Sequence, residues 1–442
     1  MDNSTILFVT SCGQDNIKKL ESFIKIFTKN NLSLSILFEN SKDYNFFKTN
    51  TKNKFVNNLN LNNLIKKYEL KDYSFNINAN YYSFFDNNKE FEINYTNSYM
   101  LIDSIFKEFK IQNCIINFGQ GVLNSFHACV INDYCKHNNI GMFFPMSNSP
   151  LNGRFMIYDN IFQNSKIFSD HYTNSLNKFN NIDKEEIFKF KNSYFLNEIN
   201  YNKRVNKFKS KINLLNFKNL LSILKDLFYK KFLYHKKIAN IKNQKPYILL
   251  LLNKSNNHWY TKFANPNLLD RKLFIENILN QLPDKYNLII KCHPRKKFEL
   301  ELERQFYNNK KICIVYENTK DPNTYLTNLL DNAEYVIGSS TTSQIVALLF
   351  NKLVIDVGSK SAYFNFDNPP VIRLKELRNM NQINKNINFS KYLNPRINAY
   401  FYSLMKISVP FNYSSKISHI TDEKTHSLMA QIIINQIYKK KN

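Results

Sequence analysis

Glycine and proline are scarce in this sequence, with 7 and 11 residues among 442. So few turn-forming residues argue against a glycine-rich β-sandwich and against a low-complexity linker protein. Arginine is also scarce, since only eight of the 61 positively charged residues are Arg. Because bidentate recognition of bases and phosphates relies mainly on Arg, the net charge of +26 does not predict a nucleic-acid partner. Peripheral contact with an anionic membrane surface or an anionic glycan stays open.

The sequence also lacks paired cysteines and targeting segments. Its six Cys residues include no CxxC pair and no Cys/His cluster at zinc spacing, which predicts buried free thiols in a reducing compartment. The first residues, MDNSTILFVTSCGQDN, contain no basic stretch followed by an apolar one, so no signal peptide is expected. No apolar run approaches the roughly 18 residues of a membrane-spanning helix. We therefore expect a cytoplasmic protein, with a peripheral location at the inner face of the cytoplasmic membrane as an option.

The chain is long enough for two domains, and its 43% of hydrophobic residues can supply two cores. We expect an N-terminal domain at 1–200 and a C-terminal domain at 246–390. Between them, 201–245 is strongly basic and predicted to be helical, a pattern most typical of solvated helix faces. The last segment, 391–442, is predicted to be helical, with packing against the first domain as an option.

Short apolar runs alternate with helical patterns in both halves, which is typical of a parallel sheet with right-handed crossovers. We therefore predict an α/β protein. Residues 41–98 give no clear pattern, and the polar stretch 147–170 is predicted to be a loop. The predicted strands are 5–10, 32–38, 114–118, 140–144, 247–252, 288–292, 312–316, 335–337 and 353–357. The predicted helices are 16–30, 125–137, 268–282, 297–308, 324–332, 342–350 and 422–440.

The most informative motif is GSSTTSQIVALLF, where a predicted strand ends and a predicted helix begins. Gly338 permits a tight turn, and Ser339, Ser340 and Thr341 follow it at the start of the helix. Hydroxyl groups, backbone N–H groups and the helix dipole together form an anion site suited to a phosphate. The alternative is an ordinary helix N-cap, which needs only one Ser or Thr.

A second motif, KCHPR, follows another buried strand of the same half. Ligands of open α/β sheets bind beyond the carboxyl ends of the strands, so this motif and the hydroxyl-rich turn are expected at one edge. The imidazole of His293 suits a hydrogen bond to a phosphate oxygen, and Lys291 and Arg295 add positive charge. The alternative is a purely structural histidine.

These residues resemble the capsule polysaccharide biosynthesis glycosyltransferases, the group that includes bacterial Kdo transferases. Polysialyltransferases and teichoic-acid glycerophosphotransferases are wider relatives. The resemblance covers about 246–365 well and 110–170 more weakly, and it lies in Lys291-Cys292-His293-Pro294, in Ser339-Ser340-Thr341 and in the strand at 353–357. It implies a GT-B-like fold, in which two Rossmann-like domains face a central cleft.

The resemblance also implies a function, the transfer of a Kdo-like or sialic-acid-like sugar from a nucleotide-sugar. The expected donor is a CMP-sugar, and the expected acceptor is a surface or capsular polysaccharide or its lipid-linked precursor, thus a glycan or glycolipid. In the family, the His-Pro and Ser-Ser residues bind the donor phosphate, a role that passes here to His293, Ser339 and Ser340. No cofactor and no metal are expected.

The residue that activates the acceptor is harder to identify. The family's acidic residue is missing from 143–149, so Asp159 is the candidate catalytic base. The alternative is a turn aspartate before Asn160. His127, expected to pack in a helix, is a weaker candidate.

Two other functions keep the same fold. Transfer of a polyol phosphate from CDP-glycerol ranks second, because those relatives carry Asp-Tyr-Ser-Ser where this chain has Ile337-Gly338-Ser339-Ser340. A non-catalytic protein that binds glycans or membrane surfaces is favoured by the missing acidic residue.

Overall fold

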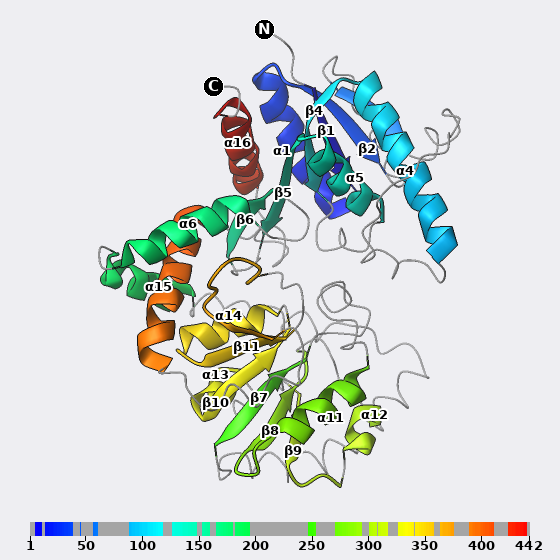
Figure 1. Ribbon diagram of the computed structural model, residues 1–442. Helices are drawn as coiled ribbons and strands as arrows, with labels where there is room; N and C mark the ends of the chain where they lie inside the picture. The colour runs from blue at the N-terminus through cyan, green and yellow to red at the C-terminus, as the bar shows by residue number, and fades with distance from the viewer. Residues whose placement is uncertain are drawn as a thin grey trace, which may run out of the picture. The chain divides into compact units, whose positions relative to one another are not determined.

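The computed structural model contains two compact α/β units (Figure 1). The first comprises Met1–Ile167 with Ile407–Asn442, and the second comprises Phe168–Lys406. The structure describes residues 5–10, 14–38, 45, 56–60, 88–117, 126–147, 153–159, 165–179, 182–194, 246–252, 270–293, 300–306, 308–316, 326–339, 341–357, 363–374, 389–410 and 423–439.

The first unit is built on a seven-stranded sheet with the order β13-β6-β5-β4-β1-β2-β3. Five strands are parallel, and β6 and β13 are antiparallel to their neighbours. The parallel strands are β1 (Thr5–Thr10), β2 (Ser33–Phe38), β3 (Val56–Asn60), β4 (Ile111–Asn117) and β5 (Gly141–Ser147), and the antiparallel ones are β6 (Arg154–Tyr158) and β13 (Val409–Pro410).

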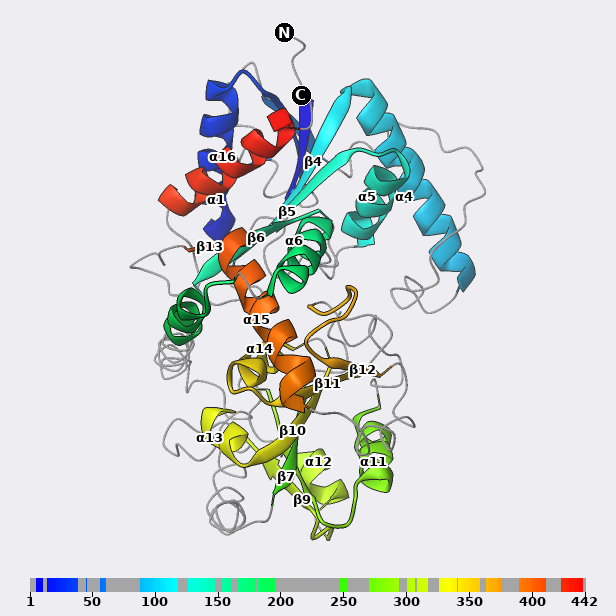
Figure 2. The ribbon, with the colours of Figure 1, turned by 60° about the vertical axis from the view of Figure 1, so that its left-hand side comes forward.

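Helices cover both faces of this sheet, as is usual for a mostly parallel sheet. Helices α1 (Gln14–Lys29) and α16 (Glu423–Lys439) lie on one side, and α4 (Asn88–Glu108) and α5 (Phe126–His137) on the other (Figure 2). The last helix packs into the same core as the first strand and the first helix.

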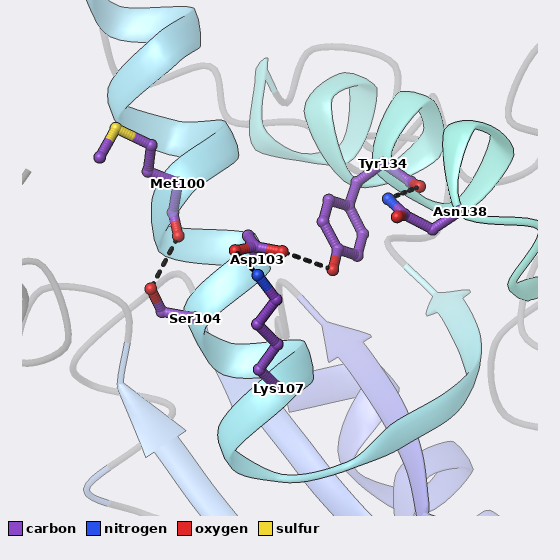
Figure 3. Close-up of polar contacts among 6 residues, drawn as sticks. All are labelled: Met100, Asp103, Ser104, Lys107, Tyr134 and Asn138. Atoms are coloured by element: carbon purple, nitrogen blue, oxygen red, sulfur yellow. Dashed lines mark hydrogen bonds and ion pairs between the residues drawn. The ribbon is translucent and has the colours of Figure 1, made fainter. Parts of the chain in front are cut away.

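Two hydrogen bonds, each from a tyrosine to an aspartate, connect helices α4 and α5. The hydroxyl of Tyr134 donates to Asp103 Oδ1 at 2.9 Å, and Lys107 forms an ion pair with the other carboxylate oxygen at 2.7 Å (Figure 3). In the opposite sense, Tyr95 of α4 donates to Asp133 of α5 at 2.9 Å. Burial, together with the nearby carboxylates, raises the pKa of both tyrosines, so each phenol stays protonated and acts as a donor.

The second unit contains a six-stranded, wholly parallel sheet with the order β12-β11-β10-β7-β8-β9. The strands are β7 (Tyr247–Leu251), β8 (Asn287–Lys291), β9 (Ile312–Val315), β10 (Ala333–Gly338), β11 (Leu353–Val357) and β12 (Ile372–Leu374). Between them come helices α11 (Arg271–Gln281), α12 (Leu300–Gln305), α13 (Leu326–Asp331) and α14 (Thr342–Leu349). Both sheets follow the Rossmann strand order, so the predicted α/β class with two Rossmann-like domains is confirmed.

The prediction of a loop at 147–170 is wrong. Strand β6 pairs antiparallel with β5, and α6 (Lys166–Asn177) begins before the predicted loop ends. Four of the five β6 residues are buried, which explains why the strand forms despite its polar flanks. The previously unclear stretch 41–98 contributes β3 and the beginning of α4, and 201–245 lies outside the described residues.

The chain passes between the units within α6 and again at the end of α15 (Phe389–Ile407). These two helices pack together, with the rings of Phe168 and Tyr400 5.5 Å apart, and Tyr172 donates to the carbonyl of Asn368 at 2.6 Å. These contacts lie within the second unit, which includes α6 from Phe168 onward.

A half-buried lysine joins the helical stretch 184–194 to α15. Lys191 Nζ donates to Asn398 Oδ1 at 2.8 Å and lies 5.1 Å from the centroid of the Phe401 ring. Neither contact supplies a negative charge. Burial therefore lowers the pKa of Lys191 to about 8.

Replacing Lys191 with Met is expected to stabilise the protein by about 1–3 kcal/mol at pH 7, because Met occupies the same space without a buried charge. The pKa is about 8 in the folded state against 10.5 ordinarily, so the penalty is complete below pH 8 and vanishes above pH 10.5. Wild-type stability measured by urea unfolding should therefore rise between these pH values, and that of Lys191→Met should rise less. Lys189→Met, at a side chain 74% exposed, is the control. A less stable Lys191→Met protein at pH 7 would contradict the prediction.

Candidate functional site

The second sheet has a switch point between β7 and β10. These strands are neighbours although β8 and β9 come between them in the sequence, so the strand order reverses there. Ligands of open α/β sheets bind in the crevice beyond the carboxyl ends at such a point. The hydroxyl-rich turn follows β10 directly, and KCHPR follows β8, one strand beyond β7. The topology thus brings both predicted motifs to one edge of the sheet.

The strand register places Lys291 and Gly338 level with each other. Ile337, Leu250 and Ile290 form one row across β10, β7 and β8, and Gly338 and Lys291 each follow that row by one residue. With strands about 4.8 Å apart, two spacings put the ends of β8 and β10 about 10 Å from each other. Lys291 is 4% exposed, and His293 is partly exposed just beyond it.

The turn after β10 is described at Ser339 and Thr341. Ser339 is 5% exposed, and Thr341 is the N-cap of α14. Thr341 Oγ1 accepts from the N–H of Ser343 at 3.4 Å, and the N–H of Thr341 donates to Gln344 Oε1 at 3.0 Å. This capping box engages two N–H groups of the first turn, so Thr341 has a structural role, and its predicted contact with a phosphate stays a prediction. A phosphate at this turn therefore depends more on the hydroxyls than the sequence indicated.

Asp159 follows β6 in the first unit. Its Oδ2 accepts from the N–H of Lys166 at 3.1 Å, at the first residue of α6. This contact supports a helix-capping role, and it leaves the predicted role as a base untested. His127 lies in α5 as expected, and burial lowers its pKa, so it is neutral near pH 7.

Two residues of this edge were not singled out from the sequence. Gln344 is fully buried, and Asp356 of β11 is 1% exposed. Gln344 Nε2 donates to Asp356 Oδ1 at 3.0 Å. The signals were present, since Thr341-x-x-Gln344 is a capping-box pattern and a carboxylate inside the apolar strand LVIDV is unusual. Arg295 and Ser340, the other predicted phosphate ligands, lie outside the described residues.

The five cysteines in the described ranges are free thiols buried in the two cores, at 114, 129, 135, 292 and 313. Cys12 lies outside those ranges. None of the helices in the described part of the chain combines the length and apolar character needed to cross a membrane.

The sequence matches no protein-family model and no curated protein. Among solved structures, the chain is similar to KpsC from Thermosulfurimonas dismutans, a β-Kdo 2,7 transferase, with 9% identity over 96% of this chain and 99% of that chain and a TM-score of 0.41. It is also similar to the UDP-GlcNAc 2-epimerase of Neisseria meningitidis bound to UDP-GlcNAc, with 11% identity over 98% of this chain and 100% of that chain and a TM-score of 0.30. For the wall teichoic acid polymerase TagF the identity is 10% over 100% of this chain and 90% of that chain, with a TM-score of 0.28. TM-scores this low carry no weight for the function of this chain.

Proposed function

We propose that this protein is a glycosyltransferase whose second unit binds a nucleotide-sugar. The observation that carries the proposal is the position of Ser339 and Thr341 at the switch point of a Rossmann-ordered sheet, with Lys291 and His293 at the same edge. A cation, an imidazole and several hydroxyls are ligands for a phosphate. The proposed donor is a CMP-sugar, and the proposed acceptor is a surface or capsular glycan or its lipid-linked precursor.

In the proposed reaction, an acceptor hydroxyl loses its proton to Asp159, and its oxygen forms a bond to the anomeric carbon of the sugar. The bond from that carbon to the donor phosphate breaks, and the nucleotide leaves with the electron pair. Lys291, His293 and the hydroxyls of the turn stabilise the charge that develops on the phosphate. The proposed reaction uses no cofactor and no metal.

His293→Ala is expected to weaken nucleotide binding by roughly tenfold, because one charge-assisted hydrogen bond to the phosphate is lost. Calorimetric titration with CMP, CDP, UDP and GDP measures the affinity and identifies the preferred nucleotide. The control is His137→Ala, at an exposed histidine of α5 in the first unit. Equal affinity in folded His293→Ala and wild-type protein would remove His293 from the site, and preference for CDP would favour polyol phosphate transfer.

A second candidate is a non-catalytic relative that binds nucleotide or glycan without turnover. The contact from Lys166 N–H to Asp159 favours it, because it gives the candidate base a structural role. Donor binding without release of free nucleotide in the presence of acceptor would support this candidate.

A further inference from the structure

The side chain of Gln344 links the turn after β10 to the neighbouring strand. Its Oε1 accepts from the N–H of Thr341 at 3.0 Å, and its Nε2 donates to Asp356 Oδ1 at 3.0 Å. Gln344 is 0% exposed and Asp356 is 1% exposed, so water does not compete for the bond between these two side chains. The three residues form a continuous connection from β11, through the buried Gln344 amide, to the backbone N–H of Thr341.

Asp356 fixes the direction of the Gln344 amide. A carboxylate only accepts hydrogen bonds, so the NH₂ group of Gln344 must face Asp356 and its oxygen must face Thr341. A buried carboxylate is costly unless it is well bonded. In the sheet, Asp356 stands beside Gly338 on one side and Arg373 on the other. Asp356 is therefore paired in the sheet with Gly338, the last residue of β10, after which the turn begins.

Gly338 leaves the space that this amide fills. A Cβ atom at Gly338 would come within 3.0 Å of Cγ and Cδ of Gln344 and 3.1 Å of Thr341 Cγ2. Any larger residue would therefore push on the amide or on Thr341. The chain is held at Gly338 by this packing and at Thr341 by the hydrogen bond from its N–H to Gln344.

We propose that Gln344 and Asp356 are positioning residues, which hold the end of β10 at Gly338 and the N-cap Thr341 ready for the phosphate of a nucleotide-sugar. The inference rests on the proposed function and extends it to residues that do not touch the donor. Ordering the turn before binding removes an entropy cost that the ligand would otherwise meet. Asp356 affects the turn only through Gln344, so a substitution that removes the Gln344 amide also removes the effect of Asp356.

The dependence of Asp356 on Gln344 gives a specific test by calorimetric titration with CMP and UDP. We expect Gln344→Met, which retains the volume over Gly338, to weaken binding of the preferred nucleotide by roughly tenfold. Asp356→Leu, which removes the acceptor of the Gln344 amide, should weaken it by roughly three- to tenfold. The double variant should bind no more weakly than Gln344→Met alone. If the two substitutions acted independently, the factors by which each weakens nucleotide binding would multiply in the double variant.

The control is Val346→Ala, which makes a cavity in the same helix and leaves the Gln344 amide intact. It should lower the melting temperature and leave the affinity unchanged. If wild-type protein binds nucleotide and both Gln344→Met and Asp356→Leu bind it equally well, the positioning role is wrong while the donor site stands. If wild-type protein binds none of the nucleotides, the donor site is wrong, and the role assigned to Gln344 falls with it.

Discussion

Replacing Asp159 with Asn is expected to lower the rate of sugar transfer by about 10²–10⁴-fold without changing the affinity for the donor. The loss follows if the carboxylate takes the proton of the acceptor hydroxyl, because an amide is not a base. Donor affinity should be retained, since the proposed donor site belongs to the second unit. The rate is measured as nucleotide released from the donor that binds in the titration, with acceptor present.

Asparagine separates the catalytic role of Asp159 from its structural one. The side-chain oxygen of Asn can still accept from the N–H of Lys166. The melting temperature should therefore change little. The control is Asp170→Asn, an equal change of charge at an exposed position of α6. Near-normal transfer by Asp159→Asn would make this residue a cap only, and the base would have to be another residue.

The second sheet was predictable because its strands are buried on both faces. Such strands appear in the sequence as short, continuous apolar runs, and LVIDV at Leu353–Val357 was predicted with its observed limits. The positions of Lys291 and Gly338 at strand ends followed directly from these runs. The strand order adds the switch point, which arises from pairing between distant segments and has no local signal in the sequence.

Elements that depend on partners far along the chain were not predictable. Strand β6 is stabilised on one side by β5 and on the other by β13, which follows about 250 residues later. Arg154 of β6 donates to Ser408 Oγ at 2.7 Å, again across that separation. The contact between Gln344 and Asp356 spans only 12 residues, but it depends on the packing of α14 against β11.

Replacing Ile433 with Ala is expected to destabilise the first unit by about 2–5 kcal/mol. Ile433 belongs to the last helix, yet it is fully buried in a core shared with Phe23 and Phe27 of α1. Removing three carbon atoms from this site loses transfer free energy and leaves a cavity among ring and backbone atoms with little freedom to move. The free energy is measured by urea unfolding, with a tyrosine or circular-dichroism signal.

The control for Ile433 is Ile93→Ala on α4, at a side chain 52% exposed, which should change stability by no more than about 0.5 kcal/mol. Nucleotide affinity provides an independent measurement, because the proposed donor site lies in Phe168–Lys406 while Ile433 lies in the other unit. At temperatures where Ile433→Ala is folded, it should bind the preferred nucleotide as wild-type protein does. A cost below about 1 kcal/mol would mean that α16 adds little to the core. A loss of nucleotide binding by the folded variant would mean that the donor site also depends on the first unit.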